Sequence, residues 1–249
     1  MGIASLEVNT GGIPQGALTQ ICTARGISSG KTTVLVSLLA QMTGREQFCA
    51  LVDAGDGFDP GSAEAAGVDL SRVLWVRCRS RRMAAATGRR LKQPEERRGS
   101  MHELGRAIGQ EEVTSEARVK HGLKPLEQAF KAADILVQNG GVGLIAVDLS
   151  GIEERQVRRV PLSTWFRFAR VVEKMNTALV FLTPYPVAQS CAALTLHMSE
   201  AESCWAGWGE ESHTQVLRQM ECEAEAARTR LRKPVRSAQA RFVTNPIWA

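Results

Sequence analysis

The sequence predicts an α/β fold in which helices flank a mostly parallel sheet and antiparallel strands follow at the C-terminal end. Continuous apolar runs of strand length occur at residues 48–52, 143–147 and 178–182. Such runs are typical of parallel strands that are covered on both faces. Apolar residues at helical spacing lie between these runs. From Val216 to Ala224, Val, Arg, Met, Cys and Ala occupy every second position, a period-2 pattern that suggests antiparallel strands.

Length and composition are those of an ordinary globular chain. Its 249 residues are enough for one α/β domain, and 44% are hydrophobic while 23% are charged. No apolar run reaches the roughly 18 residues that a membrane span needs, and the first residues lack a signal peptide's basic and apolar regions. We expect one cytoplasmic, nucleoid-associated domain over residues 1–249, with residues 210–249 as an antiparallel extension of the sheet.

The first part of the chain alternates strand and helix. The expected elements are a strand at 18–22, a helix from 31 to about 42, a strand at 48–52, a helix at 63–67 and a strand at 73–76. Gly44 is placed to end the first helix, as glycine does at helix C-termini.

Residues 79–122 interrupt this order. The stretch is rich in Arg, Gly, Glu and Ser and has little apolar periodicity, so we expect a long, flexible surface insertion. Its arginines predict an arm that contacts DNA phosphates or a protein partner: Arg81, Arg82, Arg89, Arg90, Arg97 and Arg98. The alternative is a solvated linker without a ligand. The basic part of the arm has no aromatic residue on which a base could stack, which argues against a dedicated single-strand platform.

Regular structure resumes at Pro125. The expected elements are a helix ended by Asn139-Gly140-Gly141, a strand at 143–148, a helix at 161–176, a strand at 178–182 and a last strand at 241–244. We expect Trp165 to pack in the core and the cysteines in apolar runs to be buried thiols. We expect core packing also for Trp205, Trp208 and Trp248, and the alternative is that these three anchor a partner.

The strongest chemical signal is Gly26-Ile27-Ser28-Ser29-Gly30-Lys31-Thr32-Thr33, which follows a strand and opens a helix. This is the context of a Walker A loop, whose backbone N–H groups and helix N-terminus hold phosphates. Lys31 would reach the β and γ oxygens of ATP, and the Thr32 hydroxyl would bind Mg²⁺. The residues expected to bind the nucleotide are Arg25, Gly26, Ser28, Ser29, Gly30, Lys31, Thr32 and Thr33. Arg25 stands where the motif has its first glycine, and the alternative is a vestigial loop that binds nothing.

An acid at the end of a buried strand should complete such a site. Asp148 follows the run Leu144-Ile145-Ala146-Val147 and fits a Walker B carboxylate that holds Mg²⁺ through water. ATP and Mg²⁺ are therefore the expected ligands, with Thr32 and Asp148 at the metal.

Several segments together resemble the bacterial recombinase RecA and its relatives. Gly11-Gly12-Ile13-Pro14-Gln15-Gly16 is similar to that family's opening motif, which Ser5-Leu6-Glu7 precedes. Asp53-Ala54-Gly55-Asp56-Gly57-Phe58-Asp59-Pro60 resembles its D-A-E-x-x-[LF]-D-P segment, and Gly67-Val68-Asp69-Leu70 matches the G-V-D-L that follows. The resemblance implies a RecA-like P-loop core, and it covers roughly residues 5–76 and 123–198.

The departures from the RecA pattern concern catalysis. The family's water-positioning glutamate falls at Gly55, and its adenine-stacking aromatic falls at Ser62. Its γ-phosphate-sensing glutamine would follow residue 182, where this chain has Thr183-Pro184-Tyr185-Pro186, and the DNA-binding loops after Asp148 and Leu182 look short. We therefore assign no catalytic residue.

A degenerate RecA relative of this kind resembles the ImuA-type proteins of bacterial inducible-mutagenesis operons. That resemblance implies an accessory role in the SOS response and translesion synthesis, with RecA or an ImuB-like scaffold of a mutagenic polymerase as partner. ATP would bind with little or no hydrolysis. The main alternative is an active RecA-type DNA-dependent ATPase in which Asp56 or another acid replaces the lost glutamate. A P-loop kinase is disfavoured by the recombinase-like segments.

Overall fold

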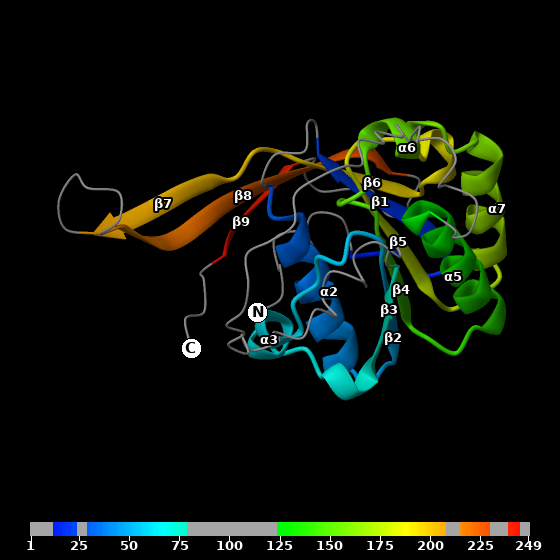
Figure 1. Ribbon diagram of the computed structural model, residues 1–249, viewed down its shortest axis with the longest axis horizontal. Coiled ribbons are helices and arrows are strands. Elements are labelled where there is room, and N and C mark those ends of the chain that lie inside the picture. The colour runs from blue at the N-terminus through cyan, green and yellow to red at the C-terminus, as the bar shows by residue number, and fades with distance from the viewer. Residues whose placement is uncertain (1–11, 24–28, 79–123, 208–214, 230–238, 245–249) are drawn as a thin grey trace, which may run out of the picture.

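The computed structural model describes residues 12–23, 29–78, 124–207, 215–229 and 239–244. They form a nine-stranded sheet in the order β3-β2-β4-β5-β1-β6-β8-β7, with β9 paired to β8 (Figure 1). The parallel strands are β1 (Ala17–Thr23), β2 (Cys49–Asp53), β3 (Val73–Arg77), β4 (Leu144–Asp148), β5 (Ala178–Thr183) and β6 (Leu194–Met198). The antiparallel strands are β7 (Glu202–Gly207), β8 (Gln215–Thr229) and β9 (Gln239–Thr244). The predicted α/β fold is confirmed.

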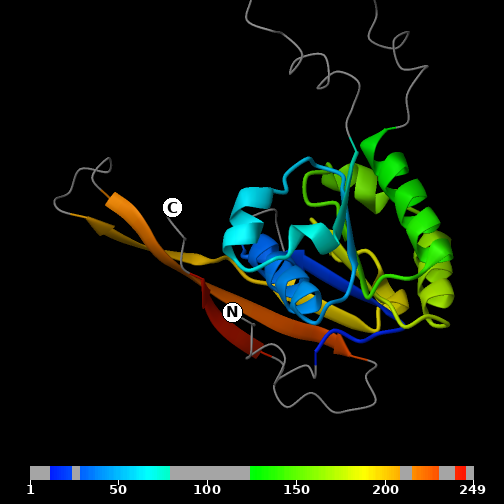
Figure 2. The same cartoon turned by 90° about the horizontal axis from the view of Figure 1, so that it is seen from below.

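Helices cover both faces of the parallel part. They are α2 (Lys31–Gly44), α3 (Pro60–Ala65), α5 (Pro125–Asn139), α6 (Glu154–Arg158) and α7 (Leu162–Val172), with 3₁₀ turns at Leu70–Arg72 and Gln189–Cys191. Figures 1 and 2 show α2 on one face and α5 with α7 on the other. Two buried clusters result, and all but one side chain of β4 and all of β5 are buried, as expected of strands covered on both sides.

An aromatic group fills the core on the α5 and α7 side. Trp165 and Phe168 project from α7 and are fully buried, as the sequence predicted for Trp165. The ring of Trp165 meets Phe181 of β5 edge-on at 5.0 Å between centroids, and Phe130 of α5 stacks on Phe168 at 5.9 Å. Aromatic pairs of this geometry each contribute about 0.5–1.5 kcal/mol beyond the area they bury.

The three antiparallel strands form a ribbon that projects from the domain (Figures 1 and 2). The ribbon begins at Glu202, before the residue-210 boundary expected from the sequence. The boundary was placed too late because the six residues of β7 are too few for a recognisable alternating pattern. The prediction that Trp205 packs in the core is wrong: its side chain is 55% exposed. It lies on β7, which pairs with β8 alone and ends the strand order of the sheet. Trp208 and Trp248 lie outside the described residues.

Some element bounds differ from expectation for local reasons. Helix α3 begins at Pro60, earlier than predicted, because the Asp59 carboxylate caps it by accepting a hydrogen bond from the Ser62 N–H at 3.0 Å. Helix α7 ends at Val172, four residues before the predicted end. In the ranges that the structure describes, no helix has the length and apolar character needed to cross a membrane.

Candidate nucleotide site

The phosphate loop joins β1 to α2 at the carboxyl edge of the sheet. β1 lies between β5 and β6, and α2 starts at Lys31 directly after Gly30, whose backbone is left-handed with φ of +75°. Residues 24–28 lie outside the described ranges, and with them the predicted ligands Arg25, Gly26 and Ser28. The hydroxyls of Thr23 and Ser29 flank this gap, and both are buried without a hydrogen-bond partner among the described residues. Buried polar atoms are normally satisfied, so these two hydroxyls fit a site that receives phosphate oxygens.

The projecting ribbon packs against the start of α2. A Cβ added to Gly30 would stand 2.5 Å from the sulfur of Cys222 on β8 and 3.6 Å from the ring of Phe242 on β9. Any residue with a side chain would collide there, so the loop requires glycine for its left-handed turn and for this contact. The sequence explained Gly30 by the loop alone and gave no sign that Cys222 covers it.

Lys31 points toward the end of β5. Its ammonium donates a hydrogen bond to the Thr183 carbonyl at 3.1 Å. Burial lowers the pKa of Lys31, while Asp148 and Cys22 act in the opposite direction. The lysine expected to reach the nucleotide is therefore held by its own chain, and a phosphate would have to replace the Thr183 carbonyl as its partner.

Asp148 and Asp53 end adjacent parallel strands and are register partners. The Asp148 carboxylate accepts a hydrogen bond from the Ser150 N–H at 2.8 Å. Burial raises the pKa of Asp148; the bonds with Ser150 lower it by less, Asp53 adds to the rise, and Lys31 acts against it. A partly buried carboxylate with this bias gains from a nearby cation, which suits Mg²⁺ as well as Lys31.

Asp53 serves the fold of the neighbouring loop. Its buried carboxylate accepts N–H bonds from Gly55 at 3.2 Å, Gly57 at 3.1 Å and Phe58 at 2.9 Å, and one from the indole of Trp75 at 3.4 Å. These bonds fix the course of residues 54–58 after β2. The sequence placed Asp53 in the RecA-like segment but did not reveal this role.

Gly55 lies against the turn that follows Asp148. A Cβ on Gly55 would stand 2.9 Å from the Cα of Gly151, closer than Cβ atoms approach backbone in folded proteins. The position where the resemblance to RecA implies a water-positioning glutamate is therefore packed against main chain. A glutamate could not be accommodated there unless one of the two loops moved.

Asp56, the alternative acid, is engaged elsewhere. Its backbone is left-handed with φ of +57°, and its carboxylate forms an ion pair with Arg77 at the end of β3. The Arg77 guanidinium in turn lies over the Trp75 ring, 4.5 Å from the centroid. This arrangement ties the Asp56 carboxylate to the end of β3.

A buried glutamine organises the loop after β5. The Gln20 amide of β1 donates to the Thr183 hydroxyl at 2.7 Å and to the Tyr185 carbonyl at 3.0 Å, and it accepts from the Ala188 N–H at 3.1 Å. The sequence offered no clear signal for this role. Gln20 and Thr19 are two polar residues in a short strand, and neither specifies a partner more than 160 positions away.

The structure thus brings together some of the predicted site residues. Ser29, Gly30 and Lys31 lie at the loop, with Asp148 close enough to affect Lys31. Thr32 is exposed and Thr33 partly exposed in the first turn of α2.

The six arginines predicted to contact DNA or a partner all lie in residues 79–123, outside the described ranges. Among the described residues, no group of three acidic, His or Cys side chains could hold a metal ion. Mg²⁺ often binds through one or two carboxylates together with phosphates and water. Thr32 and Asp148 therefore remain the candidate Mg²⁺ ligands.

Comparison with known proteins finds similarity to RecA. Residues 2–82 match the RecA N-terminal domain family. RecA of Acinetobacter baylyi is 28% identical over 143 residues, 57% of this chain and 28% of that protein. RecA of Desulfotalea psychrophila is 24% identical over 197 residues, 73% of this chain and 42% of that protein. RecA of Symbiobacterium thermophilum is 39% identical over 75 residues, 29% of this chain and 21% of that protein.

The chain therefore spans less than half the length of these curated relatives. The matched family and the parallel sheet with its antiparallel C-terminal strands together support placing this protein in the RecA-like superfamily.

Proposed function

We propose that this protein is a RecA-fold accessory factor in DNA-damage-induced mutagenesis that binds ATP with little or no hydrolysis and acts through protein partners. The partners we propose are RecA and an ImuB-like scaffold of a mutagenic polymerase. The observation that carries the proposal is the packing of Gly55 on Gly151, which leaves no room for the acid that the RecA resemblance places there. Loss of a general base costs about 10²–10⁴ in rate.

One contact and one missing residue also support binding without turnover. Lys31 bonds the Thr183 carbonyl, and the loop that follows contains no glutamine at the position expected of a γ-phosphate sensor. At the same time Gly30 is left-handed, Asp148 is acidic, and the hydroxyls of Thr23 and Ser29 have no partner among the described residues, which preserves what a phosphate and Mg²⁺ would need. When bound, Mg²⁺ would neutralise phosphate charge, and Lys31, Thr32 and Asp148 are the residues that would hold the pair.

Nucleotide binding is tested with a fluorescent ATP analogue and Mg²⁺. We expect saturable binding to the wild type that Lys31→Ala weakens at least tenfold, while Lys131→Ala on the exposed face of α5 binds like the wild type. Equal binding by both variants would show that the loop is not the nucleotide site.

Turnover separates the accessory role from an active ATPase. We expect negligible steady-state ATP hydrolysis with or without single-stranded DNA. DNA-stimulated hydrolysis that disappears in Lys31→Ala would establish the active ATPase instead. Pull-down of purified RecA and of the cassette scaffold tests the partners directly; we expect Lys31→Ala to retain binding, and capture of neither protein by the wild type would refute the accessory role.

A further inference from the structure

The register of the sheet brings a distant strand to the phosphate loop. β6 pairs with β1 on one side and with β8 on the other, and Met198 of β6 is the register partner of both Thr23 and Ala224. Thr23 is the last residue of β1, and β8 runs in the opposite direction to β1 and β6. Cys222, two residues before Ala224, therefore lies roughly 6–7 Å beyond the end of β1, on the side where the phosphate loop begins.

Two side chains of the ribbon meet Gly30. Cys222 and Phe242 are register partners on β8 and β9, and the Cys222 sulfur and the Phe242 ring are the atoms that a Cβ on Gly30 would approach. Cys222 is buried and Phe242 is partly buried. Both are van der Waals contacts, so they restrict the backbone of Gly30 and leave the N–H groups of the loop for phosphate oxygens.

Gly30 has a conformation that glycine permits but does not enforce. It is the N-cap of α2, and its carbonyl accepts the first hydrogen bond of the helix, from the Val34 N–H at 3.0 Å. Its φ of +75° turns the loop into the helix. Glycine adopts positive and negative φ about equally readily, so an unsupported Gly30 would sample other backbone conformations. The packing of Cys222 and Phe242 against it restricts that freedom.

The ribbon is itself held against α2. Ala224 and Ala240, the register pair next to Cys222 and Phe242 on the same face, are buried in one apolar cluster with Val34 of α2. The Glu223 carbonyl accepts the Ser199 N–H at 2.9 Å, which joins β8 to the end of β6. The contact with Gly30 is therefore part of the folded core and is in place before any ligand arrives.

We propose that Cys222 and Phe242 are positioning residues of the nucleotide site: they hold Gly30 in the left-handed conformation in which the phosphate loop binds ATP. This inference rests on the proposed binding of ATP at that loop, and it adds that the ribbon sets the affinity. A loop that is competent for only a fraction of the time binds with an affinity reduced by that fraction. Loosening the contact should therefore weaken ATP binding without any change in the residues that touch the nucleotide.

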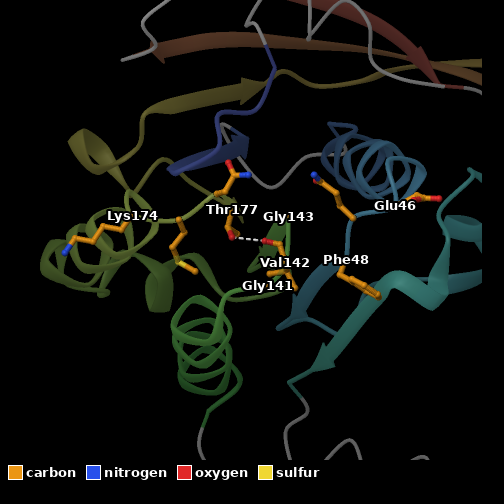
Figure 3. Close-up of a pocket in the computed structure, with 10 residues that line it drawn as sticks. Glu46, Phe48, Gly141, Val142, Gly143, Lys174 and Thr177 are labelled. Carbon is orange, nitrogen blue, oxygen red and sulfur yellow. Dashed lines mark hydrogen bonds between the residues drawn. The ribbon is translucent and has the colours of Figure 1, made fainter.

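The experiment compares Cys222→Ala with Cys49→Ala. Both cysteines are buried, and each variant loses one sulfur atom from the interior. Cys49 is the first residue of β2 and follows Phe48, which lines a cavity of about 560 Å³ at the amino edge of the sheet, opposite to the phosphate loop (Figure 3). Titration with the fluorescent ATP analogue and Mg²⁺ gives the dissociation constant of each variant, and urea unfolding gives its stability.

We expect both cysteine variants to lose stability and only Cys222→Ala to lose affinity, by threefold to tenfold. A loss of that size corresponds to a loop that is competent for about 10–30% of the time. Phe242→Ala should weaken binding by a similar factor. Its matched control is Val243→Ala, because Val243 is the next residue of β9, points to the other face of the strand and is 53% exposed, so this variant should bind like the wild type.

The outcomes separate this inference from the proposed function. Wild-type affinity in Cys222→Ala or in Phe242→Ala would overturn the role proposed for that residue and leave ATP binding at the loop intact. A loss of affinity in Cys49→Ala as large as in Cys222→Ala would also overturn the proposal, because affinity would then follow overall stability. Absence of saturable binding by the wild type would refute ATP binding itself, and this inference with it.

Discussion

Gly151 and Gly55 exclude side chains from each other: a Cβ on Gly151 would stand 2.7 Å from the Cα of Gly55. The two residues come from the loops after β4 and β2, whose last residues Asp148 and Asp53 are register partners. Parallel pairing therefore brings both loops to one point at the edge of the sheet. Their close contact explains why glycine occupies both positions.

Gly55→Ala should be destabilising. The added methyl group meets main chain, which cannot yield as a flexible side chain would, and overpacking of this kind costs about 1–3 kcal/mol. Urea unfolding measures the loss. Gly57→Ala is the matched control, because its Cβ would have no neighbour within 4 Å and its φ is not positive, so its free energy of unfolding should stay within about 1 kcal/mol of the wild type.

Gly55→Glu should not create an ATPase. The carboxylate can enter only by displacing the loop of Gly151, which moves it away from the in-line position that a catalytic base requires. Phosphate release with Mg²⁺-ATP and single-stranded DNA checks this expectation. A gain of hydrolysis above background in a folded Gly55→Glu variant would mean that the two loops separate readily.

Asp148→Asn should alter how stability depends on pH. Burial raises the pKa of Asp148, so the folded protein keeps this proton at pH values where the unfolded chain has lost it. The free energy of unfolding contributed by this group therefore falls as pH rises from 3.8 through the higher folded pKa, and above that window its ionised form destabilises the fold. Without Mg²⁺, the variant should be more stable than the wild type at neutral pH by about 0.5–2 kcal/mol.

The control for that measurement is Asp134→Asn. Asp134 forms a surface ion pair with Arg167 at 2.7 Å, and such pairs contribute about 0–1 kcal/mol, so its loss should be neutral or slightly destabilising. If Asp148→Asn is instead less stable than the wild type at neutral pH, the charged carboxylate has a stabilising partner.

Gln20→Leu should cost about 1–3 kcal/mol, because the Ala188 N–H loses its acceptor. The Tyr185 carbonyl loses one of its two donors and keeps the Thr183 hydroxyl at 2.8 Å. Thermal and urea unfolding measure the effect, and Gln138→Leu on the exposed surface of α5 should be close to neutral. A neutral Gln20→Leu variant would show that water satisfies the loop after β5 equally well.

Cysteine labelling reports whether the ribbon stays on the phosphate loop. Cys204 is exposed, whereas Cys222 is buried against Gly30 and burial raises its pKa. Burial also raises the pKa of Cys22 and Cys49 to about 12, so few of these thiolates form at pH 8. Mass spectrometry after brief alkylation should find Cys204 modified first among these four and Cys222 much more slowly. Rapid modification of Cys222 in the folded protein would mean that β8 lifts away from α2.

The sequence by itself determined the parallel core. Apolar runs predicted β2, β4 and β5 within one residue at each end, because burial on both faces leaves a continuous apolar pattern. Helical spacing predicted α5, and the glycine turn with Gly44 predicted α2. The motif Gly30-Lys31-Thr32 and the strand-terminal Asp148 were recognisable for the same reason: both are local in the chain.

The tertiary structure alone decided which distant residues meet. Gly151 on Gly55, Cys222 on Gly30 and Gln20 on the loop after β5 are contacts between segments far apart in the sequence. Strand order sets these contacts, and a single sequence specifies each strand without specifying its neighbours. Trp205 is likewise exposed because it lies on β7 in the projecting ribbon, whereas the described helices pack on the parallel strands.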